Sequence, residues 1–463
     1  MRFRCSRTEV RSATVLESSP FRLSLTHFQN SLETLKEFKT MTDSIDTKGL
    51  NRRQALTAAA ATVAAAQALF PGGAHAAGKG PETTAAKLGF IALTDASPLI
   101  IAKEKGLFAK YGMPDVEVLK QASWGATRDN IVLGSKGGGI DGAHILSPMP
   151  YQFSLGIGAR QTPMYILARL NLNGQAISVG NDLKGVQVGL NAGGAKAKFA
   201  QLKAAGNIAK VAMTYRGGTH DLWIRYWLAA AGINPETDVS TIVIPPPQMV
   251  ANIKAGTQDA FCVGEPWNGQ LVNQKIGYTA ATTSEIWMNH PEKALGMRAD
   301  WVDKNPNAAK AIIAATMEAA QWCERSRPAM CQITAGRQYI NVPINDIVPR
   351  LQGTINYGDG RNVAKSPHIM KFWSDFAAFP FKSHDTWFVT ENKRWGVIGA
   401  GVDTKALVNK VNRADLWREV AKQYGIATPA SDSRGVETFF DGKKFDPGNP
   451  DAYLNSLAIK KMA

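Results

Sequence analysis

Short apolar runs alternate with amphipathic stretches along most of the chain. Residues 87–93 predict a buried strand, residues 99–107 an apolar helix and residues 115–120 a second strand. A strand, a helix and a further strand at this spacing form a βαβ unit, which predicts a parallel sheet. Ligands of such sheets bind in the loops that follow the carboxyl ends of the strands. Asp95 and Trp124 fall in those loops.

The same alternation continues and predicts an α/β protein of two lobes. Further strands are expected at 164–170, 176–179, 184–190, 240–244 and 259–263. We expect the chain to cross between the lobes near residues 180–186 and again near 283–297, which leaves a cleft that closes by a hinge motion. The predicted organisation is a first lobe at 77–182 and 286–463, the latter including a C-terminal extension, and a second lobe at 183–285.

The region after the second crossing is expected to be structural. The spacing of apolar residues predicts a long helical hairpin at 300–330. Further on, aromatic residues such as Trp373, Trp387 and Trp395 gather in short stretches. We expect them to pack against a lobe rather than to bind a ligand.

The sequence GGTHDLW at residues 217–223 opens the most informative helical pattern. Its two glycines allow a tight backbone approach, and Thr219 is expected to cap the helix by accepting a backbone N–H. Apolar residues then recur at helical spacing, and Gly232 is suited to end the helix. His220 falls in the first turn, where free N–H groups and the helix dipole favour an anion. This stretch is therefore a candidate site for a small anion.

Two neutral donors stand in loops next to predicted strands. Trp124 precedes Gly125 at a strand-to-helix turn, so we expect its ring to be partly exposed. The indole N–H can donate to an anion, although a loop tryptophan is more often a packing residue. Gln175 carries a donor amide beside a loop glycine, and by itself is an ordinary surface amide. The glycine-rich stretch 137–144 lacks the Lys-Ser/Thr pair of a phosphate loop, and we expect His144 there to be structural.

An export signal precedes the predicted lobes. The pair Arg52-Arg53 leads into an Ala/Val/Leu run and then into an A-x-A pattern that ends at Ala76. Paired arginines before a weakly hydrophobic run are typical of a twin-arginine signal, and the run is too short to span a membrane. We expect residues 41–76 to be the signal, cleaved after Ala76 to release a soluble exported protein. Residues 1–40 are too long a lead for a signal, and we interpret them as a mis-assigned upstream extension.

Composition narrows the class of protein. The 463 residues, 44% of them hydrophobic and 20% charged, suffice for two globular domains. The formal net charge of +15 is spread along the chain without a long Lys/Arg run, which favours solubility or attraction of anions over nucleic-acid binding. Cys5 lies in the doubtful extension; Cys323 and Cys331 either pair or are buried thiols, and we favour buried thiols. No His/Cys cluster has the spacing of a zinc site.

Several short stretches of the sequence recur together in one known family. They include QASW at 121–124, NGQAIS at 173–178, GGTHDLW at 217–223, GEPWN at 264–268 and HPEK at 290–293. From about residue 87 to residue 396, the chain resembles the substrate-binding proteins of bacterial nitrate and bicarbonate ABC importers. The resemblance implies a two-lobe periplasmic-binding-protein (type II-like) fold that closes by a hinge. It also implies an anion pocket lined by Trp124, Gln175, His220 and Lys293.

Nitrate and bicarbonate differ in what a pocket must offer them. Nitrate accepts hydrogen bonds at every oxygen, so its pocket should supply donors and no carboxylate. The candidate donors are the side chains of Trp124, Gln175 and His220 and the backbone N–H groups of Gly125 and Ala126. Bicarbonate carries a hydroxyl that must itself donate, and the bicarbonate branch of the family is similar to that arrangement, with an acidic residue where this chain has Lys293. Lysine at this position supplies a counter-charge and favours nitrate.

The sequence thus predicts a periplasmic receptor that captures nitrate by hinge closure and delivers it to an ABC permease and ATPase at the membrane. Bicarbonate or nitrite in the same role are the alternatives, as is a nitrate sensor of the same fold, against which the export signal argues. No nucleophile–base pair has catalytic spacing, so we expect no enzyme activity, no cofactor or metal and no nucleic-acid partner. Each of two site residues also has a structural interpretation. Lys293 could be a solvated lysine beside Glu292, and His220 could cap its helix or hold a neighbouring loop. Glu265 is expected to be a hinge or lobe-contact residue.

Overall fold

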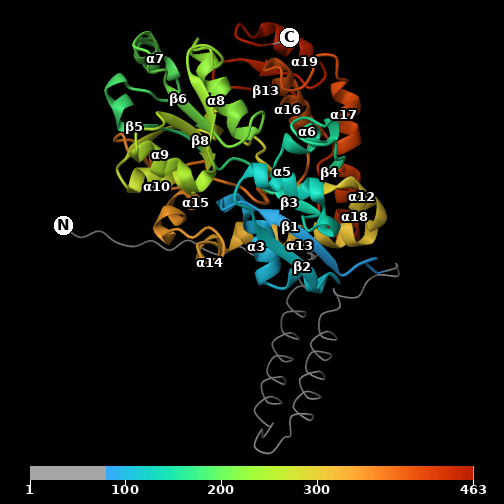
Figure 1. Ribbon diagram of the computed structural model, residues 1–463. Coiled ribbons are helices and arrows are strands. Elements are labelled where there is room, and N and C mark those ends of the chain that lie inside the picture. Colours follow the sequence, from blue (N-terminus) through green and yellow to red (C-terminus); the bar gives the residue numbers. More distant parts are fainter. Residues whose placement is uncertain (1–79, 462–463) are drawn as a thin grey trace, which may run out of the picture. The chain divides into compact units, whose positions relative to one another are not determined.

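A computed structural model describes residues 80–461 of the chain. The expected signal at 41–76, the expected extension at 1–40 and Cys5 lie outside the described residues. The described part contains two five-stranded sheets, each covered by helices (Figure 1). Among residues 80–461, no helix combines the length and the hydropathy that crossing a membrane requires.

The first sheet has the strand order β2-β1-β3-β10-β4. Its members are β2 (Asp115–Lys120), β1 (Ala85–Phe90), β3 (Gly142–Leu146), β10 (Lys293–Arg298) and β4 (Met164–Arg169). β1 runs parallel to β2 and β3, as the βαβ pattern predicts, but β10 runs antiparallel to both β3 and β4. The sheet is therefore mixed, because β10 arrives from the other lobe rather than through a helical crossover within this one.

The second sheet repeats this design with the order β7-β6-β8-β5-β9. Its members are β7 (Ser240–Val243), β6 (Lys210–Met213), β8 (Ala260–Gly264), β5 (Gln175–Gly180) and β9 (Gly277–Thr282). β6 runs parallel to β7 and β8, whereas β5 is antiparallel to β8 and β9. Each lobe thus contains one strand that enters from its partner lobe and runs against the others.

The chain crosses between the sheets twice. The first crossing runs from β4 to β5 through residues 170–174, which is earlier than the predicted 180–186. The predicted strand at 184–190 is absent, and Asn181–Val186 forms a 3₁₀ helix instead. The second crossing runs from β9 to β10, within the predicted 283–297. The prediction of two lobes joined by two crossing segments is confirmed, with the first crossing displaced toward the N-terminus.

Helices cover both sheets and build the C-terminal region. The predicted hairpin at 300–330 consists of three helices, and the C-terminal segments add four short strands in two pairs, β11 (Ile355–Asn356) with β12 (Asn362–Val363) and β13 (Glu437–Thr438) with β14 (Lys444–Phe445). The helices are α3 (Ser97–Glu104), α4 (Leu107–Lys110), α5 (Trp124–Leu133), α6 (Met149–Leu155), α7 (Ala195–Ala204), α8 (Thr219–Ala230), α9 (Met249–Lys254), α10 (Trp267–Asn273), α11 (Thr283–Ile286), α12 (Ala299–Lys304), α13 (Pro306–Arg325), α14 (Arg327–Thr334), α15 (Val348–Leu351), α16 (Lys382–Arg394), α17 (Thr404–Val411), α18 (Ala414–Gln423) and α19 (Pro450–Ser456).

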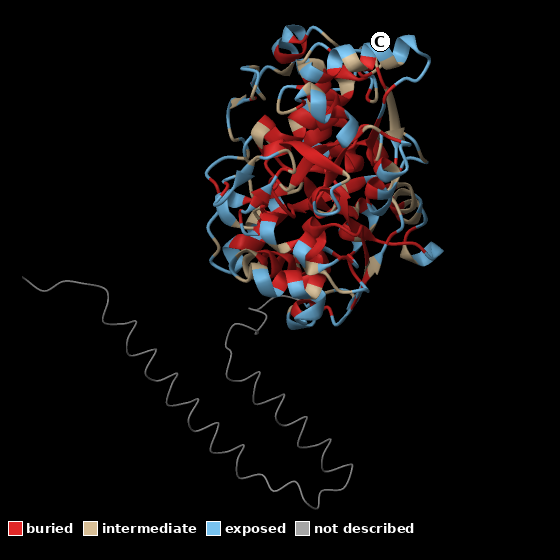
Figure 2. Ribbon diagram, turned by 90° about the vertical axis from the view of Figure 1, so that its left-hand side faces the viewer, coloured by how far each residue is buried: buried red, intermediate tan, exposed pale blue. Residues whose placement is uncertain are grey.

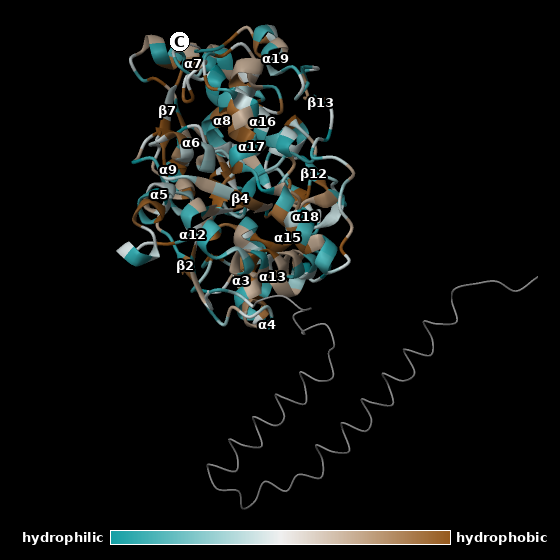
Figure 3. Cartoon of the chain, turned by 90° about the vertical axis from the view of Figure 1, so that its right-hand side faces the viewer, coloured by the Kyte–Doolittle hydropathy of each residue, from teal (hydrophilic) through white to brown (hydrophobic). Residues whose placement is uncertain are grey.

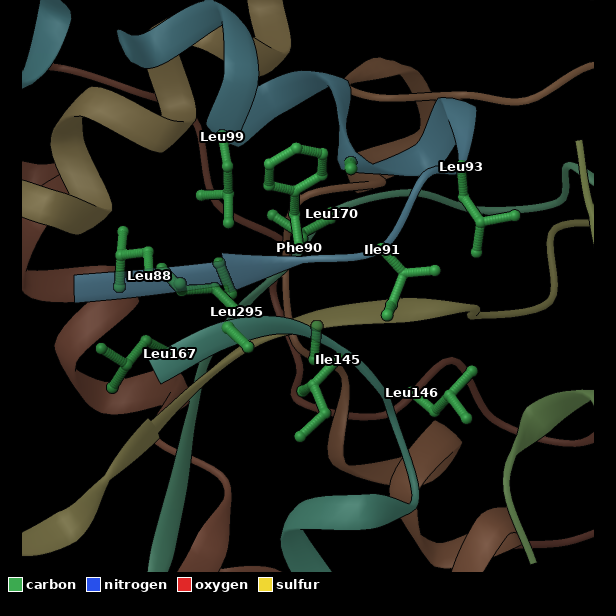
Figure 4. Packing of buried hydrophobic residues seen from close by; sticks show 14 of the residues in the cluster. Leu88, Phe90, Ile91, Leu93, Leu99, Ile145, Leu146, Leu167, Leu170 and Leu295 are labelled. Atoms are coloured by element: carbon green, nitrogen blue, oxygen red, sulfur yellow. The ribbon is translucent and has the colours of Figure 1, made fainter. Parts of the chain in front are cut away.

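Buried apolar residues form two clusters. The larger surrounds the first sheet, where Leu88 and Phe90 of β1 meet Leu99 of α3 and Leu295 of β10 (Figure 4). The smaller lies around the second sheet and α8. Figure 2 shows the buried residues gathered in the interior, and Figure 3 shows polar residues over much of the outer helices. Cys262, Cys323 and Cys331 are free and buried, which confirms the preference for buried thiols.

The C-terminal region packs on both lobes. Trp387 of α16 stacks on Trp223 of α8 with ring centroids 4.8 Å apart, and Trp395 belongs to the same cluster as the second sheet. Trp417 of α18 joins the cluster of the first sheet. The expectation that the C-terminal aromatic residues are packing residues is confirmed for Trp387 and Trp395. The C-terminal region therefore contacts the second lobe through α16 and the first lobe through α18, in addition to the two crossing segments that join the lobes.

Helix α8 starts differently from the prediction. Gly218, not Thr219, is the N-cap residue, and no side chain caps this end. Gly217 adopts a φ of +68°, a left-handed conformation that favours glycine, and its N–H donates to Asp221 Oδ2 at 2.7 Å. The Thr219 hydroxyl instead donates to Glu292 Oε1 at 3.3 Å. The helix ends before Gly232, whose φ is +72°, as the sequence predicts.

Candidate functional site

Three of the predicted site residues meet between the lobes. Lys293 begins β10, Trp124 is the first residue of α5 and His220 is the second residue of α8. The Lys293 ammonium lies 5.7 Å from the centroid of the Trp124 ring, within the range of a cation–π contact. His220 Nε2 lies 2.9 Å from Oε1 of Glu292, the neighbour of Lys293. The N-terminus of α5 in the first lobe and that of α8 in the second lobe therefore lie close to the start of β10.

All three side chains are completely buried. Trp124, His220 and Lys293 each have 0% relative exposure. The expectation that Trp124 is partly exposed is wrong, because its ring is buried in the cluster of the first sheet, beside the Lys293 ammonium and the His144 ring. The alternative that Lys293 is a solvated lysine is wrong because its side chain is buried as well. A fully buried ammonium needs a partner, since an isolated charge in a protein interior costs several kcal/mol or more.

Gln175 lies near Trp124, His220 and Lys293, because it pairs with the last residue of β8, which approaches Asp95. It is the first residue of β5 and pairs with Gly264. A side chain at Gly264 would place its Cβ 3.0 Å from Asp95 Oδ2, so Asp95 of the first lobe reaches this strand end. Gln175 also borders a cavity of about 10 Å³, the size of one water, together with Glu265 and Arg350.

The amide groups at the start of α5 are only partly free. Ser123 caps this helix by accepting the Ala126 N–H at 3.0 Å. The expectation that Ala126 offers its N–H to a ligand is therefore wrong. Gly125 is half-buried in the first turn, where the helix dipole and the remaining N–H groups favour an anion.

Several buried donors of the site have no partner in the described part of the protein. They are Trp124 Nε1, Gln175 Nε2 and His220 Nε2. Although His220 Nε2 is close to Glu292, the geometry does not form a hydrogen bond. An unsatisfied buried donor costs about 1–3 kcal/mol, so three of them in one region require an explanation. A ligand that accepts hydrogen bonds provides one.

Two carboxylates surround Lys293, and the sequence pattern does not predict them. Lys293 Nζ donates to Asp95 Oδ2 at 2.9 Å and also to Glu292 Oε1. His144 Nε2 lies 2.5 Å from Asp95 Oδ1, while its Nδ1 accepts the Ile91 N–H at 3.4 Å. The expectation of a pocket without a carboxylate is therefore wrong. The carboxylates are there because the ammonium, once buried, needs counter-charges.

The surroundings shift the pKa values of these groups in different directions. Burial opposes ionisation of Asp95, but Lys293 and His144 outweigh it and lower its pKa to about 2. Burial dominates at Glu292 and raises its pKa to about 7 despite the attraction of Lys293. Burial also lowers the pKa of His220 well below its usual value, and that of His144 as well. At neutral pH both imidazoles are therefore neutral, and His220 can donate from Nε2 while Nδ1 contacts Thr214 Oγ1 at 2.5 Å.

The two lobes are in direct contact around the site. The Thr94 N–H donates to the Glu265 carbonyl at 2.8 Å, and Trp267 Nε1 donates to the Ala92 carbonyl at 3.1 Å. Glu265 is thus a lobe-contact residue, as expected. Closed lobes exclude water and strengthen each electrostatic interaction between them. Within residues 80–461, no group of three or more His, Cys, Asp or Glu side chains is arranged to hold a metal ion.

Two α/β lobes, joined by two crossing segments and enclosing buried donors, define a periplasmic-binding-protein fold. Residues 79–337 match the NMT1-like family, and the chain belongs to that family. The crystal structure of the periplasmic nitrate-binding protein NrtA from Synechocystis matches this fold with a TM-score of 0.80 and 59% identity, over 82% of this chain and 100% of that one.

Relatives with two different ligands in their names are similar to the chain. The nitrate/nitrite binding protein NrtA of Synechocystis sp. is 60% identical over 390 residues, covering 82% of this chain and 86% of that protein. The bicarbonate-binding protein CmpA of Synechococcus elongatus is 41% identical over 396 residues, covering 82% of this chain and 88% of that protein. The family resemblance seen in the sequence is confirmed, and the nitrate branch is the more similar of the two.

Proposed function

We propose that this protein is the periplasmic substrate-binding receptor of an ABC importer and that it captures nitrate between its closing lobes. The observation that carries the proposal is the set of three buried N–H donors without a protein partner, on Trp124, Gln175 and His220, beside the Lys293 ammonium. Nitrate has three oxygens, all of them acceptors, and a single negative charge. The higher identity to NrtA than to CmpA supports the same choice.

Each proposed ligand-binding residue has a separate role. Trp124 belongs to the first lobe, and Gln175 and His220 belong to the second, so donors from both sides hold the anion and keep the lobes closed. The Gly125 amide adds a donor at the start of α5. Lys293 supplies positive charge, although it shares that charge with two carboxylates. The protein binds its ligand and carries out no reaction, so no residue is assigned a catalytic role.

Bicarbonate is the second candidate ligand. Glu292 Oε2 is a buried acceptor without a partner among the described residues, and the hydroxyl of bicarbonate needs such an acceptor. Nitrite, which appears in the name of the NrtA relatives, has two oxygens and a nitrogen lone pair as acceptors, so it cannot place an oxygen opposite each of the three donors. We therefore expect nitrite to bind more weakly than nitrate, by about 5-fold or more.

Titration calorimetry of the protein beginning at residue 77 tests the proposal. Nitrate, nitrite and bicarbonate are titrated in turn, with and without Ca²⁺, in buffers free of dissolved CO₂. We expect heat from nitrate, weaker binding of nitrite and no dependence on Ca²⁺. Tight bicarbonate binding together with no nitrate heat would refute the nitrate assignment.

The proposed role also implies export and membrane partners. We infer that residues 41–76 direct export by the twin-arginine route, and that the mature protein delivers nitrate to a permease and ATPase without a nucleic-acid partner. Replacing Arg52 and Arg53 together by lysine should retain the precursor in the cytoplasm. The control substitutions Lys48→Arg and Arg298→Lys, which lie outside the arginine pair, should leave export unchanged. Fractionation followed by N-terminal sequencing measures both the location and the cleavage after Ala76.

A further inference from the structure

The buried charges around Lys293 do not balance once an anion is added. Asp95, Glu292 and Lys293 all have 0% relative exposure, and both carboxylates contact the one ammonium. His144 and His220 are neutral at pH 7, because burial lowers the pKa of each. With both carboxylates ionised, the cluster has a net negative charge before nitrate binds, and a larger one afterwards. Groups in this situation usually neutralise by taking up a proton.

Glu292 is the group that can accept a proton without losing a contact. Both oxygens of Asp95 are occupied, Oδ1 by His144 at 2.5 Å and Oδ2 by Lys293 at 2.9 Å. Glu292 uses only Oε1, which contacts the Lys293 ammonium and the Thr219 hydroxyl, while its Oε2 has no partner among the described residues. A proton on Oε2 therefore breaks no existing hydrogen bond, whereas a proton on Asp95 would displace one.

We propose that nitrate binds together with one proton and that Glu292 holds this proton on Oε2. This inference rests on the proposed nitrate function and specifies how the same site tolerates its ligand. An ionised Glu292 presents only acceptors to nitrate, but the protonated acid presents an O–H donor. The residue thus contributes a further hydrogen bond to the anion and removes a repulsive charge at the same time. Bicarbonate needs the opposite state, since its hydroxyl donates to an ionised carboxylate.

The groups around Glu292 come from each element packed against it. They are Lys293 of β10, Asp95 after β1, His144 of β3, His220 of α8 and Cys262 of β8. Of these, Lys293 is the cation, and Asp95 competes with Glu292 for it. Burial raises the pKa of Glu292 to about 7 before a ligand is present. A bound anion adds a repulsion that raises this pKa further.

Nitrate affinity should consequently depend on pH in one direction. Between the pKa of Glu292 in the free protein and its higher pKa in the complex, the complex holds more protons, so binding weakens as the pH rises. Below the lower of the two values, Glu292 is protonated in both states and the affinity is constant. Above about pH 7, the Kd should rise by up to about tenfold per pH unit.

Calorimetry at several pH values measures this linkage directly. Nitrate is titrated into the protein beginning at residue 77 from pH 6 to pH 9, in phosphate and in Tris, whose different ionisation enthalpies report the protons taken up per nitrate. At pH 8 we expect uptake approaching one proton by the wild type. Glu292→Gln, which is neutral and of the same shape, should take up none and should show the same Kd at each pH. Glu318→Gln changes a carboxylate that pairs with Lys110, and it should retain the wild-type linkage.

The outcomes separate this inference from the proposed function. Nitrate binding by the wild type with a constant Kd and no proton uptake from pH 6 to pH 9 would overturn the inference and leave the nitrate function intact. Persistent proton uptake by Glu292→Gln would place the proton elsewhere and also overturn it. Absence of nitrate binding at every pH, with bicarbonate bound, would refute both proposals. The wild-type measurement decides the linkage even if the variant fails to fold.

Discussion

Asp221 and His220 are neighbouring buried polar residues of α8, and they differ in how many of their polar atoms have a hydrogen-bond partner. Asp221 accepts from Arg225 Nε at 2.6 Å and from the Gly217 N–H at 2.7 Å. Arg225 also contacts Glu236 and donates to Thr241 Oγ1 at 3.1 Å. His220, one residue earlier, has a contact through Nδ1 but no hydrogen bond at Nε2.

The number of hydrogen-bond partners distinguishes the residues that stabilise the fold from those that are available to a ligand. A buried network in which each polar atom has a partner stabilises a single arrangement of the backbone. A buried donor without a partner lowers stability, and a ligand that accepts a hydrogen bond from it offsets that cost. The Arg225 group therefore stabilises the fold of the second lobe, and the donors around His220 are left for the anion.

The largest expected effect comes from reversing the charge at the site. Lys293→Glu replaces the ammonium by a third carboxylate between Asp95 and Glu292, which adds repulsion between buried like charges. We expect the nitrate Kd to rise by more than about 100-fold, measured by calorimetry at pH 7. Circular dichroism checks that the variant is folded. An unchanged Kd would remove Lys293 from the site.

A second variant breaks the satisfied group instead. Arg225→Met leaves Asp221 and Glu236 without their cation, and removing one partner of a buried ion pair costs about 3–5 kcal/mol. Urea unfolding should show this loss in the free energy of unfolding. The nitrate Kd of the folded variant should stay within about twofold of the wild type, because Arg225 contacts no proposed ligand-binding residue. A large loss of affinity with unchanged stability would contradict the division between the two groups.

A matched pair of tryptophan variants sharpens the comparison with a smaller effect. Trp124→Phe removes a donor that has no protein partner, so it should weaken nitrate binding by about 10- to 100-fold through loss of one charge-assisted hydrogen bond. Trp227→Phe removes an indole that donates to the Gly189 carbonyl at 3.0 Å, so it should lower stability by about 1–3 kcal/mol and leave binding unchanged. Calorimetry and urea unfolding are measured on both. Equal effects of the two variants on binding would show that the free donor at Trp124 has no special role.

Local patterns in the sequence predicted much of the fold. The strand at 115–120 matches β2, and the helix after the two glycines ends before Gly232 as expected. The strand expected at 176–179 matches β5, but the first crossing was misplaced because that strand was assigned to the first lobe, whereas β5 belongs to the second sheet. Its burial comes from pairing with β8 and β9, which lie about 80–100 residues later in the chain. Pairing over such a distance leaves little trace in the local pattern.

The sequence indicates which residues of the proposed site come together, but it does not indicate their environment. Trp124, His220 and Lys293 meet as the family resemblance implies, but their complete burial depends on contact between the lobes. The roles of Asp95 and Glu292 were missed for the same reason. Asp95 was noticed only as a residue in a ligand-facing loop, and its contact with Lys293 joins residues 198 positions apart. Lys293 itself could have indicated these two carboxylates, since a buried cation implies a nearby carboxylate.

A crystal structure of the protein with nitrate tests the central claim most directly. The account predicts one nitrate between the lobes, with its oxygens within about 3.2 Å of Trp124 Nε1, Gln175 Nε2 and His220 Nε2. Nitrate bound elsewhere, or bound between the lobes while these three nitrogens keep their present surroundings, would contradict it.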